Sequence, residues 1–164
     1  MGLASLVVEE QGLTFRENAI TKARAYLEAY RIPALADDSG ICVDALAGAP
    51  GVRSARFGRQ TLDDAGRVAY LLEQLLGVHE SGRTAHYTCC LALALPDQPL
   101  LVVDGYCYGR IGHTPTPGTT GFGYDPVFLL PAAGRAVSQV TPEQKDAISH
   151  RGNAVRLLLR KFRI

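Results

Sequence analysis

Apolar residues recur along this chain with two spacings, one typical of helices and one typical of strands. The helical spacing runs from Thr14 to Tyr30, and Thr14 with Glu17 fits a capping box, so we predict a helix that begins at this threonine. A second helix is expected to begin at Thr61 and to close at Gly77 with a left-handed cap. Its predicted buried face consists of Leu62, Ala65, Ala69, Leu72 and Leu76.

Strict alternation of side chains predicts a long antiparallel β-hairpin in the middle of the chain. Residues 84–95 form its first strand, and residues 100–111 return after a proline-rich turn. Gly105 indicates a bulge in the returning strand. Because successive side chains leave a strand on opposite faces, the adjacent Cys89 and Cys90 are expected to point in opposite directions.

Two adjacent carboxylates, Asp37 and Asp38, stand between the apolar runs 32–36 and 41–46. The Ser39-Gly40 pair supplies turn chemistry after them, so we expect a strand, a turn and a second strand. If the two carboxylates lie in extended backbone, they point to opposite faces and need separate roles. One of the two can then hold structure while the other faces a cleft. The alternative is a plain turn whose aspartates bond their own backbone.

The C-terminal region predicts a helix with cations in its first turn. Ser149 is a suitable N-cap, and His150 and Arg151 follow it directly. A helix N-terminus carries partial positive charge, so these side chains gain nothing from the dipole. Their donors suit a carbonyl oxygen or a phosphate, and solvated surface charge is the alternative. The apolar residues expected to face the core are Ala154, Leu157, Leu158 and Phe162.

A glycine-rich stretch over residues 118–126 lacks the Gly-Lys-Ser/Thr ending of a P-loop. Its glycines allow close approach of a ligand, and Phe122 or Tyr124 can stack on a planar base. The alternative is a tight loop that enters a buried strand.

Lys22 also has two interpretations. It is either a lysine on the flank of a helix or a contact to phosphate.

Composition limits the class of protein. With 164 residues and 47% hydrophobic content, residues 1–164 are expected to form a single domain. The formal net charge of +1 argues against a nucleic acid polymer as partner. No signal peptide or transmembrane run is apparent, so we expect a cytoplasmic protein without membrane contact. The cysteines, which lack metal-ligand spacing, are expected to be reduced core residues: Cys42, Cys89, Cys90 and Cys107.

Four motifs, in order, resemble one family. They are Glu-Glu-x-Gly-x-Thr-Phe-x-Glu-Asn-Ala from Glu9, Ala-Asp-Asp-Ser-Gly from Ala36, Gly-Phe-Gly-Tyr-Asp-Pro from Gly121, and Lys-x-x-Ile-Ser-His-Arg-Gly from Lys145. The chain is similar to the inosine/xanthosine triphosphate pyrophosphatases. The resemblance implies an α/β fold with an elongated, twisted mixed sheet flanked by helices, and two lobes that enclose a nucleotide cleft. It also implies a homodimer that hydrolyses purine nucleoside triphosphates to monophosphate and pyrophosphate.

The same resemblance implies roles for individual residues. Asp38 is the catalytic carboxylate and approaches Mg²⁺, with Glu9 or Glu10 as the second metal carboxylate. Asp37 is then expected to contribute mainly to stability. His150 and Arg151 read the 6-keto group of the purine. The other implied substrate contacts are Ser39, Lys22 and Lys145 at the phosphates or ribose, and Phe122, Gly123, Tyr124 and Asp125 at the nucleobase.

One departure concerns the N-terminal end of the sequence. Members of the family begin with a strand and a Gly-Asn-x-x-Lys loop that holds the triphosphate, whereas this sequence begins near the end of that unit. We therefore keep two alternatives open: a nucleotide-binding protein with impaired catalysis, and a magnesium-dependent phosphohydrolase that acts on a smaller phosphate ester.

Overall fold

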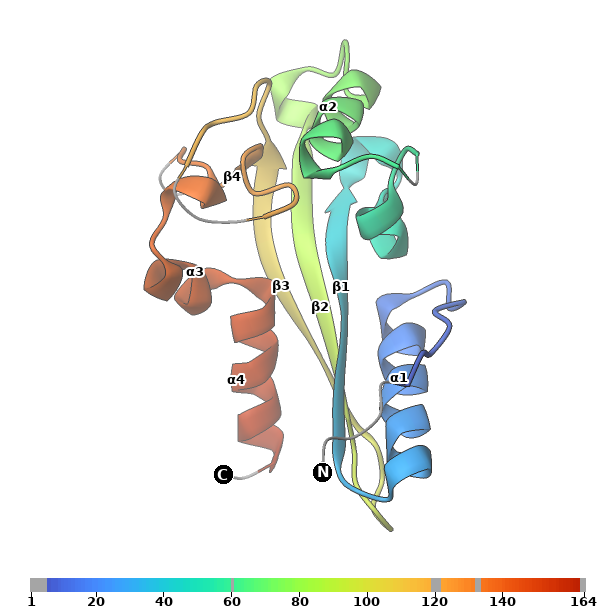
Figure 1. The fold of residues 1–164 in the computed structure, drawn as a ribbon. Helices are drawn as coiled ribbons and strands as arrows, with labels where there is room; N and C mark the ends of the chain where they lie inside the picture. Colours follow the sequence, from blue (N-terminus) through green and yellow to red (C-terminus); the bar gives the residue numbers. More distant parts are fainter. Residues whose placement is uncertain (1–5, 60, 119–121, 132–133, 163–164) are drawn as a thin grey trace.

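A computed structural model describes residues 6–59, 61–118, 122–131 and 134–162. Three long strands form the centre of the fold, with helices on both sides (Figure 1). The helices and strands are α1 (Phe15–Tyr30), β1 (Ala34–Val43), α2 (Asp64–Gln74), β2 (Thr84–Ala94), β3 (Leu101–Ile111), β4 (Phe128–Leu129), α3 (Pro142–Ile148) and α4 (His150–Phe162). Among the described residues, no helix has the length and apolar character needed to cross a membrane.

The sheet has the order β1-β2-β3-β4, and the predicted hairpin is its β2–β3 pair. All pairings between the described strands are antiparallel. The α/β fold with an elongated, twisted sheet is therefore confirmed, but the described strands contain no parallel pair of the kind that a mixed sheet requires.

Helices α1 and α4 cover opposite faces of the sheet (Figure 1). On one face, Cys90 packs with Ala19 and Ala23 of α1. On the other face, Cys89 packs with Ala154 and Leu158 of α4. The neighbouring cysteines thus point in opposite directions, as predicted, and all four thiols are free. A third apolar cluster joins the sheet to α2 through Ile41, Val43, Leu71, Leu75, Val127 and Phe128.

The expected turn at Ser39-Gly40 is wrong, because β1 runs without interruption from Ala34 to Val43. Ser39 pairs with Cys89 and Gly40 pairs with Thr88 in a continuous register. A Cβ atom on Gly40 would lie 2.4 Å from Ser54 Oγ and 2.6 Å from a backbone oxygen. This glycine therefore permits the close approach of a neighbouring segment.

The bulge expected at Gly105 is also wrong. The β2–β3 register passes through Gly105 without an extra residue. A Cβ atom there would lie 2.3 Å from both the backbone nitrogen of Ala154 and the backbone oxygen of His150. The glycine is required because the first turn of α4 rests directly on β3.

The helix starts were predicted better than the helix faces. The capping box of Thr14 and Glu17 is present at the start of α1. In contrast, α2 begins two residues later than expected, with Asp63 rather than Thr61 as its N-cap.

The buried face of α2 was predicted wrongly, because apolar residues occupy both flanks of this helix and spacing alone does not select one. The structure buries Val68, Leu71 and Leu75, whereas Leu76 is 78% exposed. In α4, Ala154 and Leu158 are buried as predicted, but Leu157 and Phe162 are 39% and 41% exposed.

Candidate functional site

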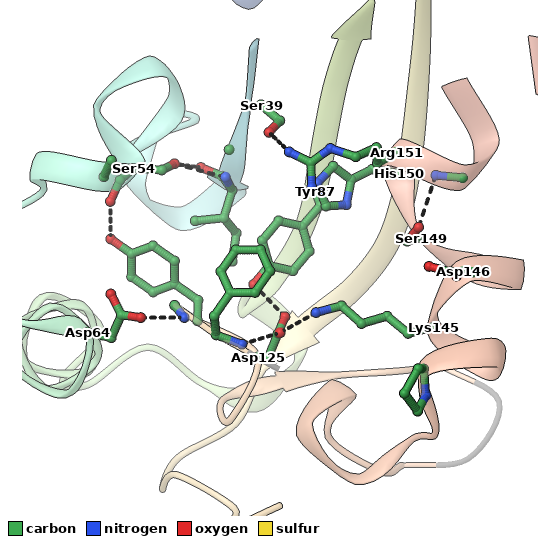
Figure 2. A pocket seen from close by; sticks show the side chains of 18 of the residues that line it. Ser39, Ser54, Asp64, Tyr87, Asp125, Lys145, Asp146, Ser149, His150 and Arg151 are labelled. Atoms are coloured by element: carbon green, nitrogen blue, oxygen red, sulfur yellow. Dashed lines mark hydrogen bonds and ion pairs between the residues drawn. The ribbon is translucent and has the colours of Figure 1, made fainter. Parts of the chain in front are cut away.

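A cavity of about 790 Å³ opens on the face of the sheet that carries α4. This volume lies within the range of pockets that bind small organic ligands, roughly 300–1,000 Å³. The lining comes from segments far apart in the sequence (Figure 2). It includes Ser39, Asp64, Tyr87, Phe122, Gly123, Tyr124, Asp125, Lys145, His150 and Arg151.

Asp125 organises one wall of this cavity. Its carboxylate is almost fully buried and accepts hydrogen bonds from Lys145 Nζ at 2.6 Å and from the backbone nitrogen of Phe122 at 2.8 Å. The Tyr87 hydroxyl donates a third bond, at 3.3 Å. Lys145 also lies 4.6 Å from the centroid of the Phe122 ring. These contacts hold an exposed aromatic ring beside a cation, which suits a planar ligand with polar edges.

His150 lies deeper in the cavity, where it stacks on Tyr87. The ring centroids are 4.9 Å apart and the planes differ by 13°. Burial, together with the charge of Arg151, lowers the pKa of His150 from 6.5 to about 4. The imidazole is therefore neutral at physiological pH and has one donor and one acceptor nitrogen. Ser149 caps this helix as predicted, accepting from the backbone nitrogen of Gly152 at 3.0 Å.

Arg151 is held by β1 across a separation of 114 residues. Its Nε and Nη2 donate to Asp37 Oδ2 at 2.9 Å and 2.6 Å, and Nη2 also donates to Ser39 Oγ at 3.1 Å. Burial alone would lower the pKa of Arg151, but the hydrogen bonds and charge of Asp37 raise it. Asp37 thus contacts Arg151 in the candidate site, although we predicted for it mainly a role in stability.

A second cluster surrounds Asp38 on the opposite face of β1. Asn18 Nδ2 donates to Asp38 Oδ2 at 3.0 Å, and Lys22 Nζ donates to Asp38 Oδ1 at 3.3 Å. Lys22 also forms a 2.6 Å ion pair with Glu10. Burial raises the pKa of Asp38 even though Asn18 and Lys22 oppose this change. For Lys22, burial would lower the pKa, but the bonds and charges of the two carboxylates raise it.

The structure separates the two candidate metal carboxylates. Glu10 joins Asp38 through Lys22, whereas the bond that Glu9 accepts, from Gln11 Nε2 at 2.6 Å, lies outside this cluster. The described residues contain no group of three or more His, Cys, Asp or Glu side chains that would hold a metal alone. Mg²⁺ usually binds one or two carboxylates together with substrate phosphates. The pair of Asp38 and Glu10 fits that requirement.

Sequence reasoning missed three residues of these clusters. Asn18 lies four positions before Lys22 on the predicted helix, and that spacing was the available signal. Tyr87 lies within the alternating pattern of residues 84–95, which does not distinguish it from its neighbours. Asp64 accepts a 2.8 Å bond from the backbone nitrogen of Gly123, and no local signal links these two distant segments.

These features define a class of protein. It is an α/β protein whose strand β1, at one edge of the described sheet, presents an aromatic and cationic ligand cavity on one face and a carboxylate–lysine cluster on the other. The comparison with known families then gives the particular one: the chain belongs to the Ham1 family, whose model matches residues 3–161.

Individual relatives agree with this assignment. The chain is 50% identical over 152 residues to a dITP/XTP pyrophosphatase of Streptomyces avermitilis, covering 93% of this chain and 76% of the relative. It is 46% identical over 157 residues to a dITP/XTP pyrophosphatase of Yersinia pseudotuberculosis, covering 94% and 79%. The solved structure of the Staphylococcus aureus Ham1 protein superposes with a TM-score of 0.91 at 38% identity, covering 96% of this chain and 81% of that one.

Proposed function

We propose that this protein hydrolyses ITP, dITP and XTP to the monophosphate and pyrophosphate, and so removes these nucleotides from the cellular pool. The observation that carries the proposal is the arrangement on β1. Ser39 faces the cavity beside Arg151, and the adjacent Asp38 faces the carboxylate–lysine cluster. A single strand therefore joins a pocket suited to a purine with a site suited to phosphate chemistry. The names of relatives that are 42–50% identical support the same activity.

Recognition of the base is assigned to the cavity. A purine stacks against the aromatic wall at Phe122, while donors of His150 and Arg151 meet its 6-keto oxygen. Adenine carries an amino group at that position, so the bound base would cover these donors without offering an acceptor, at a cost of about 1–3 kcal/mol per unpaired group. This difference explains discrimination against ATP. Lys145, expected at phosphate or ribose, is held by Asp125 in the base wall.

The reaction is assigned to the Asp38 cluster. Asp38 and Glu10 would hold Mg²⁺, which neutralises charge on the triphosphate when it is bound. Lys22 supplies a further cation at the same place. Asp38 positions the attacking water and accepts its proton, and attack at the α-phosphorus releases pyrophosphate. Asn18 keeps the Asp38 carboxylate oriented through its 3.0 Å hydrogen bond. We also propose a cytoplasmic homodimer, which light scattering and cell fractionation would test.

The decisive experiment is Asp38→Asn. Asparagine is nearly isosteric but neither accepts the proton nor neutralises a metal, so we expect loss of Mg²⁺-dependent pyrophosphate release from ITP by at least about 100-fold. Affinity for IMP, measured by calorimetry, should stay within about twofold because the cavity lies on the other face of β1. Asp97→Asn, in the exposed β2–β3 turn, is the matched control.

Activity near the parent level in Asp38→Asn would contradict this assignment. The products distinguish the alternatives. Orthophosphate in place of pyrophosphate would indicate a phosphohydrolase of a different kind. Tight IMP binding without turnover by the parent protein would indicate a nucleotide-binding protein with impaired catalysis.

A further inference from the structure

Asp37 is next to Asp38 in β1, but its side chain leaves the strand on the other face and contacts α4. We propose that Asp37 is a positioning residue that aims Arg151 into the cavity and thereby sets the preference for keto purines. This inference rests on the proposed function and assigns a role in that function to a residue that the sequence motif alone does not distinguish from a structural carboxylate.

The hydrogen-bond geometry supports the proposal. Nε and Nη2 of Arg151 both donate to Asp37 Oδ2, and Nη2 also donates to Ser39 Oγ. Within the described part of the chain, Nη1 of Arg151 has no hydrogen-bond partner, and the residue lines the cavity (Figure 2). The guanidinium is planar, so fixing its Nε–Nη2 edge also fixes the direction in which Nη1 donates.

The position of Arg151 in α4 makes this partner necessary. Arg151 is the second residue of the helix, where the partial positive charge of the N-terminus disfavours a cation. The first turn of α4 contains no acidic residue that could compensate. The carboxylate of Asp37 is the opposite charge that meets this guanidinium. Without it, the side chain would lose both its counter-charge and two of its three hydrogen bonds.

The exposure of the Asp37–Arg151 pair argues against a purely stabilising role. The side chains of Arg151 and Asp37 are 48% and 38% exposed. Solvent screens such ion pairs, and they usually contribute little to folding stability. Loss of Asp37 should therefore shift the midpoint of thermal unfolding by no more than about 3 °C. This differs from the sequence-based view of Asp37 as a residue that holds structure.

Consecutive placement of the two aspartates has a functional consequence. Asp38 acts in the reaction on one face of β1, and Asp37 orients the base-reading arginine on the other. The two functions are then separated by one residue along β1, which pairs with β2 over its whole length. A keto purine that engages Arg151 is held in a fixed relation to the reacting phosphate.

A double-mutant cycle tests the proposal with Asp37→Ala, Arg151→Ala and the double variant. We expect Asp37→Ala to raise KM for ITP by about tenfold, in line with loss of charged hydrogen bonds, with kcat and the weak turnover of ATP changed less than about twofold. In the Arg151→Ala background, Asp37→Ala should add no further loss. IMP affinity should follow the same non-additive pattern. Glu80→Ala, which removes the exposed Glu80–Arg110 pair far from the cavity, is the matched control.

Additive losses in the cycle, or equal losses on ITP and ATP, would overturn the positioning role. Failure of the proposed function would look different, because the parent protein would then release no pyrophosphate from ITP. In that case the IMP affinities of the four proteins still decide whether Asp37 acts through Arg151, and additive losses of IMP affinity would refute it.

Discussion

Replacement of Gly105 by alanine tests how strictly the packing of α4 on β3 determines the base site. The new methyl group would lie 2.3 Å from the backbone nitrogen of Ala154 and from the backbone oxygen of His150. Ordinary contacts begin near 3.4 Å, so the helix must withdraw by about 1 Å. The atoms in the way belong to backbone, which has no rotamer to change. The first turn of α4 must therefore move, and it carries His150 and Arg151.

Two measurable losses follow from this displacement. Overpacking of this kind typically costs about 1–3 kcal/mol of unfolding free energy, which urea denaturation would detect. Misplacement of binding groups by about 1 Å should also weaken IMP binding by about tenfold or more, measured by calorimetry. The loss of IMP affinity should exceed what the reduced stability explains, because calorimetry measures binding under conditions in which the protein is still folded.

Gly82→Ala is the matched control for Gly105→Ala. Its methyl group would meet only a side-chain carbon of Val78, at 3.3 Å, in an exposed short helix, Glu80–Gly82. We expect little change in either measurement. Parent-level stability and IMP affinity in Gly105→Ala would refute the reasoning that the close contact between β3 and α4 fixes the site.

Two further predictions concern stability. Because the unfolded chain protonates His150 near pH 6.5 and the folded protein only near pH 4, its stabilising contribution is present above pH 6.5 and falls as the pH drops toward 4. In His150→Gln, the change in unfolding free energy between pH 6.5 and pH 4 should be smaller than in the parent, by at most about 3 kcal/mol. The exposed control His113→Gln should keep the pH dependence of the parent. Parallel curves of unfolding free energy against pH for the parent and His150→Gln would contradict this prediction. The buried Arg83 donates to three backbone carbonyls, of Leu75, Ile111 and Gly112. Arg83→Met should cost about 3 kcal/mol or more in urea denaturation, and a loss no larger than that of the exposed control Arg24→Met would be inconsistent with this account.

Short-range physics explains which predictions from the sequence were confirmed. The capping box at Thr14 and the cap at Ser149 depend on groups within one helical turn. The opposite orientations of Asp37 and Asp38 depend only on the alternation of side chains in a strand. The resemblance of four motifs gave the family, which the comparisons confirmed.

The remaining features depended on packing between distant segments. The glycines at 40 and 105 resemble turn and bulge signals, but the structure explains them by the approach of the segment at Gly51–Arg56 and of α4. Our proposal of Glu10 rather than Glu9 as the second metal carboxylate required knowing where Lys22 lies relative to both.

The contact between Asp37 and Arg151 shows most clearly what the sequence alone could not decide. The chain pattern placed Asp37 on the face opposite Asp38 and placed Arg151 in the first turn of a helix. Neither fact predicts that the two side chains make contact, because the residues are 114 positions apart. Their contact depends on the register of the sheet and on the packing of α4 against Gly105. Hydrogen bonds within a turn and the alternation of side chains in a strand depend on neighbours in the chain. The site instead forms when distant segments bury their apolar surfaces against one another, and no local pattern shows which segments will meet.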